Sequence, residues 1–294
     1  MKDATILRIA GKCVDFASPA PTVARMRHED GPGVYDAWKI CDGERRYLLK
    51  RCGAVERGIY EALAGRVDCL PICYGVARAY GKDHLLLEFV EGRDLMRGER
   101  AGLTLALDAI VRMQDAFWGS DEAIGTPFGS ALAAAEKRRE HLPEKELRQA
   151  YDRFLELYAS VPRTLCHDDL LPFNLIVDGR RAVLIDWEHG GILPYPASVA
   201  RLIAHTRPDP DWLFYLSEED RTFALEIYYE RLIRHKGIAR EDYRRTMEAF
   251  LFYEATEWVY VYRRAGLRED ARYRDALERS RALAARLLGE ERER

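Results

Sequence analysis

Residues that favour β-strands recur in short runs through the first third of the chain. Five such runs occupy residues 23–28, 34–41, 45–50, 75–80 and 84–89. Turn signals separate them at Asp30-Gly31-Pro32-Gly33, Asp42-Gly43 and Gly81-Lys82-Asp83. The pattern predicts a meander of three strands, then a helix over residues 54–64, then a hairpin of two further strands.

The hydrophobic pattern becomes helical from about residue 92 onward. The predicted helices cover residues 103–117, 130–139, 144–158, 218–235, 240–264 and 269–288. A strand-rich first third and a helical remainder define an α+β protein with two lobes, which we place at residues 1–91 and 92–294.

The segment over residues 164–186 holds an acidic loop between apolar runs and reads TLCHDDLLPFNLIVDGRRAVLID. Carboxylates are depleted in strands, so the chain is expected to leave its strand at His167-Asp168-Asp169. Pro172 has no amide hydrogen to donate, which excludes a regular helix or a central strand there. A polar loop between buried runs indicates a functional site.

A hairpin is expected directly after this loop. Residues 175–177 and 182–185 are rich in Val, Ile and Leu, and they flank Asp178-Gly179, a dipeptide that favours a tight turn. Asn174 and Asp186 stand at the two outer ends of this hairpin. Their side chains are therefore expected to converge.

The pattern His167-x-Asp169-x-x-x-x-Asn174, followed by Ile185-Asp186-Trp187-Glu188, resembles the aminoglycoside phosphotransferase and choline kinase family, relatives of the protein kinases. The resemblance implies a bilobal kinase-like fold with an N-terminal antiparallel sheet and one helix, and a mostly helical C-terminal lobe. It also implies that Asp169 is the catalytic base and that Asn174 and Asp186 hold Mg²⁺. Asp169 matches the base, and Asp168 does not, because Asp169 stands five residues before Asn174.

These residue types suit phosphoryl transfer to an alcohol. An alcohol has a very high pKa, so a carboxylate mainly orients it and accepts its proton late, while positioning and charge neutralisation supply most of the rate. Mg²⁺ prefers hard oxygen ligands such as carboxylate, amide and phosphate oxygens. The alternative interpretation is a hairpin with solvated acids at its mouth, which the five-residue offset disfavours.

Lys50 ends the third predicted strand, as the lysine of the family's strand-three motif does. A lysine at a strand end is most often a solvated edge residue, but the next helix offers a partner. On a wheel of roughly 100° per residue, Glu56 lies roughly 20° from Leu63 in the buried stripe, whereas Glu61 falls on the far side. Glu56 is therefore the expected partner of Lys50.

The resemblance also implies nucleotide contacts. The run HLLLEFVEG at residues 84–92 resembles the family's hinge, where backbone groups near Glu88 and Val90 would bind the adenine edge of ATP, with GTP as the alternative. The first turn, which ends at Gly33, resembles the nucleotide loop, where glycines let backbone amides approach phosphates. Without the other motifs, these segments read as an ordinary strand exit and a connecting turn.

The sequence departs from the family pattern after Asp186. The family usually has a further Asp that opens a helix and supports the catalytic loop, and Ser198 stands near that place here. Ser can still cap a helix. The departure leaves open how the catalytic loop is braced.

The predicted helix over residues 240–264 combines acids with aromatic residues. Glu254, Glu257 and Trp258 share one face by their three-and-four spacing. Acids beside aromatic faces suit a cationic substrate, and the same candidate acceptor site includes Glu188. The alternative is a core helix whose Glu residues pair with nearby Arg.

Composition excludes several classes of protein. Lys and Arg number 46 against 49 Asp and Glu, a formal net charge of -3, which gives no basic field for nucleic acid. The six cysteines are scattered and read as reduced thiols, with zinc or a disulfide as the alternative. No apolar run suits a signal peptide or a membrane span, so we expect a cytoplasmic protein, a monomer or a homodimer.

The sequence therefore predicts an ATP- and Mg²⁺-dependent kinase that phosphorylates a hydroxyl of a small molecule. An amine-bearing acceptor of the aminoglycoside type is the first choice, and choline, ethanolamine or an amino-sugar is the alternative. Two other classes remain open: a pseudokinase that binds nucleotide without turnover, and a metal phosphohydrolase built on His167, Asp168, Asp186 and His189.

Overall fold

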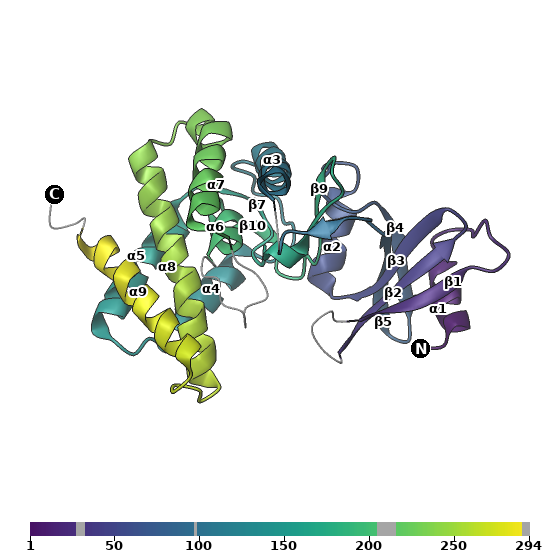
Figure 1. Cartoon of the computed structure of the whole chain (residues 1–294), viewed down its shortest axis with the longest axis horizontal. Helices are drawn as coiled ribbons and strands as arrows, with labels where there is room; N and C mark the ends of the chain where they lie inside the picture. The colour runs from purple at the N-terminus through teal and green to yellow at the C-terminus, as the bar shows by residue number, and fades with distance from the viewer. Residues whose placement is uncertain (28–32, 97–98, 205–215, 290–294) are drawn as a thin grey trace.

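The computed structural model describes residues 1–27, 33–96, 99–204 and 216–289 of the 294-residue chain. A sheet-rich N-terminal part lies on the right of Figure 1, and a helical C-terminal part lies on the left. Helix α2 (Ala54–Leu63) and strand β9 (Ala182–Leu184) lie where the two parts meet.

The N-terminal sheet is antiparallel throughout, with the strand order β1-β2-β3-β5-β4. Its strands are β1 (Thr22–Arg27), β2 (Val34–Asp42), β3 (Arg45–Cys52), β4 (Cys73–Ala79) and β5 (Lys82–Glu88). All five predicted runs form strands, and each end agrees within about two residues, as assignments of element ends commonly do. His28, the last residue of the first predicted strand, lies outside the described residues.

The hairpin between β4 and β5 turns earlier than the sequence predicted. Tyr80 and Gly81 both have left-handed backbone, with φ of 52° and 71°. Positive φ at both central residues is the signature of a two-residue type I′ turn, whose twist matches that of the flanking strands. Lys82 and Asp83, which were predicted in the turn, therefore begin β5.

A short helix that the sequence pattern did not predict covers one face of the sheet. Helix α1 (Asp3–Ala10) buries Ile6 and Ile9 against a cluster that includes Trp38 and Leu86 from the sheet. This small core belongs to the N-terminal part alone. Helix α1 therefore stabilises one face of the sheet, and the larger core of the molecule lies on the other side.

The C-terminal part is mostly helical. Its helices are α3 (Arg100–Ala116), α4 (Phe128–Arg139), α5 (Lys145–Ser160), α6 (Ala197–Ile203), α7 (Glu218–Arg231), α8 (Arg240–Arg264) and α9 (Ala271–Gly289), with 3₁₀ helices η1 (Pro172–Asn174) and η2 (Ile233–Lys236). The predicted helix over residues 218–235 ends early at Arg231 and continues as η2. Short strands complete this part: β6 (Arg93–Asp94), β7 (Arg163–Cys166), β8 (Leu175–Val177), β9 and β10 (Gly191–Pro194).

Helix α2 connects the two parts of the molecule. Its Ile59 and Leu63 belong to the large core that also contains Leu107 of α3 and Leu184 of β9. The Leu184 N–H donates to the carbonyl oxygen of Cys69, which follows α2, at 2.7 Å. The elements that carry the candidate site residues are thus packed against one another.

The predicted fold class is confirmed: an antiparallel N-terminal sheet with a helix precedes a mostly helical C-terminal part, the bilobal kinase-like arrangement. The predicted division at residues 91 and 92 stays a prediction. Strand β6, just beyond it, pairs with β8 and not with the N-terminal sheet. Within the described part of the chain, no helix is both long and apolar enough to cross a membrane.

Candidate active site

The acidic loop lies between β7 and the β8–β9 hairpin. Strand β7 pairs with β10, and Pro172 opens the 3₁₀ turn η1 that leads into β8. The Ile185 N–H donates to the carbonyl oxygen of Asn174 at 3.0 Å, directly beyond the ends of the hairpin. The backbones at Asn174 and Asp186 are therefore neighbours, as the hairpin predicted.

His167 anchors the loop from inside the core. Its ring is fully buried, Nε2 lies 2.7 Å from the carbonyl oxygen of Ile185, and the ring packs against Trp187. Burial lowers the pKa of His167 to about 4, so the ring is neutral and Nε2 donates its proton to that carbonyl. This bond joins the start of the loop to the residue before Asp186.

Ser198 braces the same loop. The backbone N–H of His167 donates to Ser198 Oγ at 2.9 Å, and Ser198 is fully buried at the start of α6. The hydroxyl therefore provides the bracing contact that the departure from the family pattern had left open. Ser198 lies inside α6, where Pro196 is the N-cap, so it does not cap the helix.

The two adjacent acids have different surroundings. Asp168 has left-handed backbone with φ 62°, which residues other than Gly adopt uncommonly. Among the described residues its carboxylate accepts no hydrogen bond, and burial raises its pKa to about 6. Asp169 instead accepts bonds from Nε and Nη2 of Arg201, at 3.1 and 2.9 Å.

Lys50 pairs with Glu56, the partner that the helical wheel indicated. Lys50 Nζ lies 2.8 Å from Glu56 Oε1 and 2.6 Å from Asp186 Oδ1. Burial opposes the charge of Lys50, but Glu56 and Asp186 outweigh it, and the pKa of Lys50 is raised. Burial likewise raises the pKa of Glu56, although Lys50 opposes the rise. Glu61 is exposed, and among the described residues it pairs with Arg57 of its own helix.

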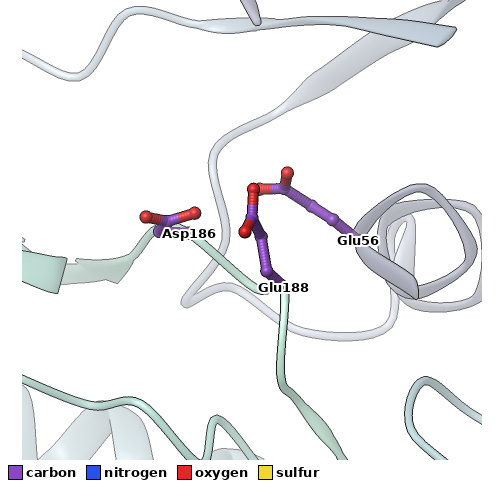
Figure 2. Close-up of side chains that lie close together, drawn as sticks. All are labelled: Glu56, Asp186 and Glu188. Carbon is purple, nitrogen blue, oxygen red and sulfur yellow. The ribbon is translucent and has the colours of Figure 1, made fainter. Parts of the chain in front are cut away.

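Three carboxylates gather where a metal ion is expected. Glu56, Asp186 and Glu188 each offer an oxygen within 4.8 Å of the others, and Figure 2 shows Glu188 reaching toward Glu56 beside Asp186. Asp186 has φ 66°, which turns it out of the strand direction of β9. Glu188, which was predicted at the acceptor site, lies beside Glu56 and Asp186, and its role stays a prediction.

The donor set fits Mg²⁺. The side-chain amide nitrogen of Asn174 donates to the backbone oxygen of Asp169 at 2.8 Å, which leaves the amide oxygen as a metal donor. An amide oxygen together with the exposed carboxylate of Asp186 makes a hard, all-oxygen set. Asn174 and Asp186 could thus hold the ion, with Glu188 close by.

The predicted nucleotide contacts lie along β5 and its exit. The Glu88 N–H donates to the carbonyl oxygen of Ile72, and the Glu88 carboxylate pairs with Arg181 at 2.7 Å. Within the described residues, the Val90 N–H has no protein acceptor and remains a donor for a ligand. Gly33 is exposed directly before β2, while the rest of the predicted turn, residues 30–32, lies outside the described residues.

The acids of α8 already have cationic partners. Arg201 Nη1 donates to Glu254 at 2.8 Å and to Glu257 at 2.6 Å. Arg138 lies 3.7 Å from Glu257 and over the ring of Tyr253. This is the arrangement that the alternative interpretation of the helix described. Trp258 is partly buried and packs near Tyr262.

Sequence reasoning missed Arg201, which contacts three predicted site residues. Its only sequence signal is its position: a charged residue within the apolar run ASVARLI, three residues after Ser198 and so on the same helical face. A charged residue inside a buried run is informative because it requires a partner.

The fold and the site together define a phosphotransferase with a kinase-like fold. The profile of the phosphotransferase enzyme family matches residues 32–248, and the chain belongs to this family. The predicted class of enzyme, a phosphotransferase with an alcohol group as acceptor, is thereby confirmed. No curated protein matches the sequence.

Solved structures agree with this fold. A candidate aminoglycoside phosphotransferase from Ralstonia eutropha JMP134 is 17% identical, with a TM-score of 0.63 and 96% of each chain covered. The choline kinase LicA from Streptococcus pneumoniae is 14% identical, with a TM-score of 0.60 and coverage of 96% of this chain and 98% of that one. A thermostable mutant of an aminoglycoside phosphotransferase, solved with AMP-PNP and hygromycin B, is 18% identical, with a TM-score of 0.59 and coverage of 90% and 94%.

Lys50→Ala is expected to lower kcat/KM by about 100-fold or more, because it removes a charged donor beside the expected phosphates. Glu56→Ala should cost less, because Glu56 only orients Lys50. The double variant should be no worse than Lys50→Ala alone, since the two side chains act as one unit. Glu61→Ala is the matched control on the exposed side of α2. Steady-state kinetics of the four variants check the pairing, and independent losses would contradict it.

Asp168→Asn is expected to stabilise the protein at pH 8 by about 1–3 kcal/mol. The folded-state pKa of Asp168, about 6, lies above its ordinary unfolded value, so above pH 6 the folded state carries a buried charge without a hydrogen bond. As pH falls from about 6 to about 4, wild type gains the proton and the difference should vanish. Asn also tolerates the left-handed backbone. Urea unfolding across this range measures the effect, and a difference that does not vary with pH would contradict it.

Proposed function

We propose that the protein transfers the γ-phosphoryl group of ATP to a hydroxyl of a small molecule. In this proposal Lys50, oriented by Glu56, binds the phosphates, and Asp169 orients the acceptor hydroxyl and takes its proton. Asn174 and Asp186 hold Mg²⁺, which when bound neutralises charge on the phosphates. The nucleotide base lies along the backbone near Glu88 and Val90, and the backbone at Gly33 approaches the phosphates.

The observation that carries this proposal is the contact of Lys50 with both Glu56 and Asp186. It joins a residue of β3, a residue of α2 and the acid that follows β9, which are three parts of a phosphate and metal site. In the phosphoryl-transfer template, the lysine and glutamate pair and the metal-binding acid must be in place together. The neighbour solved with AMP-PNP, an ATP analogue, supports ATP over GTP.

We propose an amine-bearing alcohol as the acceptor, with an aminoglycoside as first choice and choline, ethanolamine or an amino-sugar as the alternative. The support comes from the structural neighbours, which include aminoglycoside phosphotransferases and choline kinases. Trp258 and the acids Glu188, Glu254 and Glu257 stay candidates for the acceptor site. Any amine at Glu254 or Glu257 would have to share them with Arg201.

The two other classes have weaker support. The pseudokinase interpretation was based on Ser198, but this residue braces His167 through a hydrogen bond. The phosphohydrolase needs clustered histidines, and within the described residues the group of candidate metal ligands consists of three carboxylates.

We also propose a cytoplasmic enzyme, a monomer or a homodimer, that acts on small molecules and binds neither nucleic acid nor membranes. All six cysteines are free thiols, which suits a reducing compartment. The formal net charge of -3 does not favour nucleic acid.

A panel of acceptors tests the function. ADP formation from ATP is measured with aminoglycosides, choline, ethanolamine and amino-sugars, each beside an N-acetylated or amine-free analogue, and ³¹P NMR identifies the phosphate ester. We expect at least one amine-bearing alcohol to be phosphorylated. ADP without an ester would indicate a hydrolase, and ATP binding without ADP would indicate a pseudokinase.

With an accepted substrate, Asp169→Asn should lower kcat by about 10²- to 10⁴-fold, because it removes the proton acceptor while keeping the size of the side chain. The KM for ATP should hardly change, because Asp169 faces the acceptor. Asp168→Asn, the adjacent control, should leave kcat nearly unchanged. Steady-state kinetics of both variants decide which of the two acids is the base. A larger loss of kcat in Asp168→Asn than in Asp169→Asn would reject the assignment of the loop, including Asn174.

Asp186→Ala should abolish turnover and leave the fold intact, because it deletes a metal ligand from a half-exposed position and removes no packing. Activity is measured over a Mg²⁺ titration, with far-UV circular dichroism and thermal melting as the test of folding. Activity that returns to the wild-type level at saturating Mg²⁺ would reject Asp186 as the ligand.

A further inference from the structure

Arg201 joins the catalytic loop to helix α8. Its Nε and Nη2 atoms donate to Asp169 Oδ1, and its Nη1 atom donates to Glu254 Oε2 and to Glu257 Oε2. The guanidinium side chain is only 11% exposed, and that of Glu254 is 5% exposed. A single cation thus fastens three carboxylates from two segments that are far apart in the sequence.

The contact leaves one oxygen of Asp169 available. Both bonds from Arg201 end on Oδ1, and among the described residues Oδ2 accepts no hydrogen bond. An arginine presents its N–H groups in a rigid planar fork, so two bonds to Oδ1 fix where that oxygen lies. The free oxygen is the one that can meet a substrate hydroxyl.

We propose that Arg201 is a positioning residue that holds Asp169 by Oδ1 so that Oδ2 faces the acceptor hydroxyl. The inference rests on the proposed function, because it takes Asp169 to be the base. It goes further than the proposed function because it gives Glu254 and Glu257 a structural role. Through Arg201 these two acids hold the base in place.

The charges explain why Arg201 stays where it is. Burial raises the pKa of Glu254 to about 7, and Arg201 opposes this rise. Without the guanidinium, Glu254, Glu257 and Asp169 would face one another as neighbouring acids, and an uncompensated buried charge is strongly destabilising. Glu254 and Glu257 therefore hold the Nη1 side of the Arg201 guanidinium in place. Its Nε and Nη2 atoms then donate to Asp169 from a fixed position.

Helix α6 supports the loop at two points. Ser198 and Arg201 stand three residues apart and so share one face. Ser198 Oγ accepts a hydrogen bond from the backbone N–H of His167. Arg201 donates to the side chain of Asp169, two residues later. This arrangement fixes both the backbone and the carboxylate. A displacement of about 1 Å from reacting geometry can cost about 10²-fold in rate.

Arg201→Lys tests the inference with the positive charge retained. A lysine offers one ammonium in place of the two-pronged fork, so we expect kcat to fall by about 10- to 100-fold while the KM for ATP stays the same. Arg100→Lys is the matched control, because Arg100 also donates from Nε and Nη2 to one carboxylate oxygen, Oδ1 of Asp220, but does not contact Asp169. It should change kcat by less than about twofold. An undiminished kcat in Arg201→Lys overturns the proposal.

A double variant separates positioning from a general structural effect. In the Asp169→Asn background, Arg201→Lys should cause no further loss of kcat, because the base that it positions is gone. A residue that only stabilises the fold would still lower activity there. Losses that multiply would therefore overturn the proposal.

A second readout needs no substrate. Urea unfolding of Arg201→Lys, Asp169→Asn and the double variant measures whether the two side chains are coupled in the folded protein, and Glu254→Gln with Arg201→Lys relieves the buried charge if the single variant folds poorly. Coupling between positions 169 and 201 supports the proposal, and additive effects overturn it. A wild type that phosphorylates no acceptor in the panel defeats the proposed function instead.

Discussion

The site depends on one buried ion pair. Glu56 is fully buried, and a carboxylate in that position without a cation would be strongly destabilising, so Lys50 must remain beside it. Lys50 belongs to β3 and Glu56 to α2, and the same ammonium contacts Asp186, which is 136 residues away in sequence. Because α2 also packs in the large core, this contact fixes the sheet relative to the β8–β9 hairpin.

The catalytic loop is fixed from its other side by α6. The family pattern places an Asp where this chain has Ser198, yet the contact needs only one acceptor for the N–H of His167. A hydroxyl provides that acceptor without a charge. Ser198 is fully buried and bonds the residue before Asp168, whose pKa is already raised by burial, so a neutral hydroxyl avoids a further desolvated carboxylate. The substitution is therefore compatible with a braced loop.

The features that the sequence predicted are those with local signals. Asp178-Gly179 between apolar runs predicts the hairpin, and helical periodicity alone places Glu56 on the buried side of α2. Arg201 could not be found in this way, because its partners in α8 lie more than 50 residues away and only tertiary packing joins them. The left-handed backbone of Asp168 was missed for a similar reason, since the fold imposes it against the preference of the residue.

The two sides of the site differ in their balance of charge. On the side of Asp169, Arg201 lies among Asp169, Glu254 and Glu257, and Arg138 adds a second cation near Glu257. On the other side, Lys50 is the cation that pairs with Glu56 and Asp186, and Glu188 lies close to both acids. A triphosphate would bring further negative charge to that side, and one ammonium cannot balance it. The proposed function therefore includes a divalent cation at Asn174 and Asp186, because without it the acids beside Lys50 would repel the phosphates of a bound nucleotide.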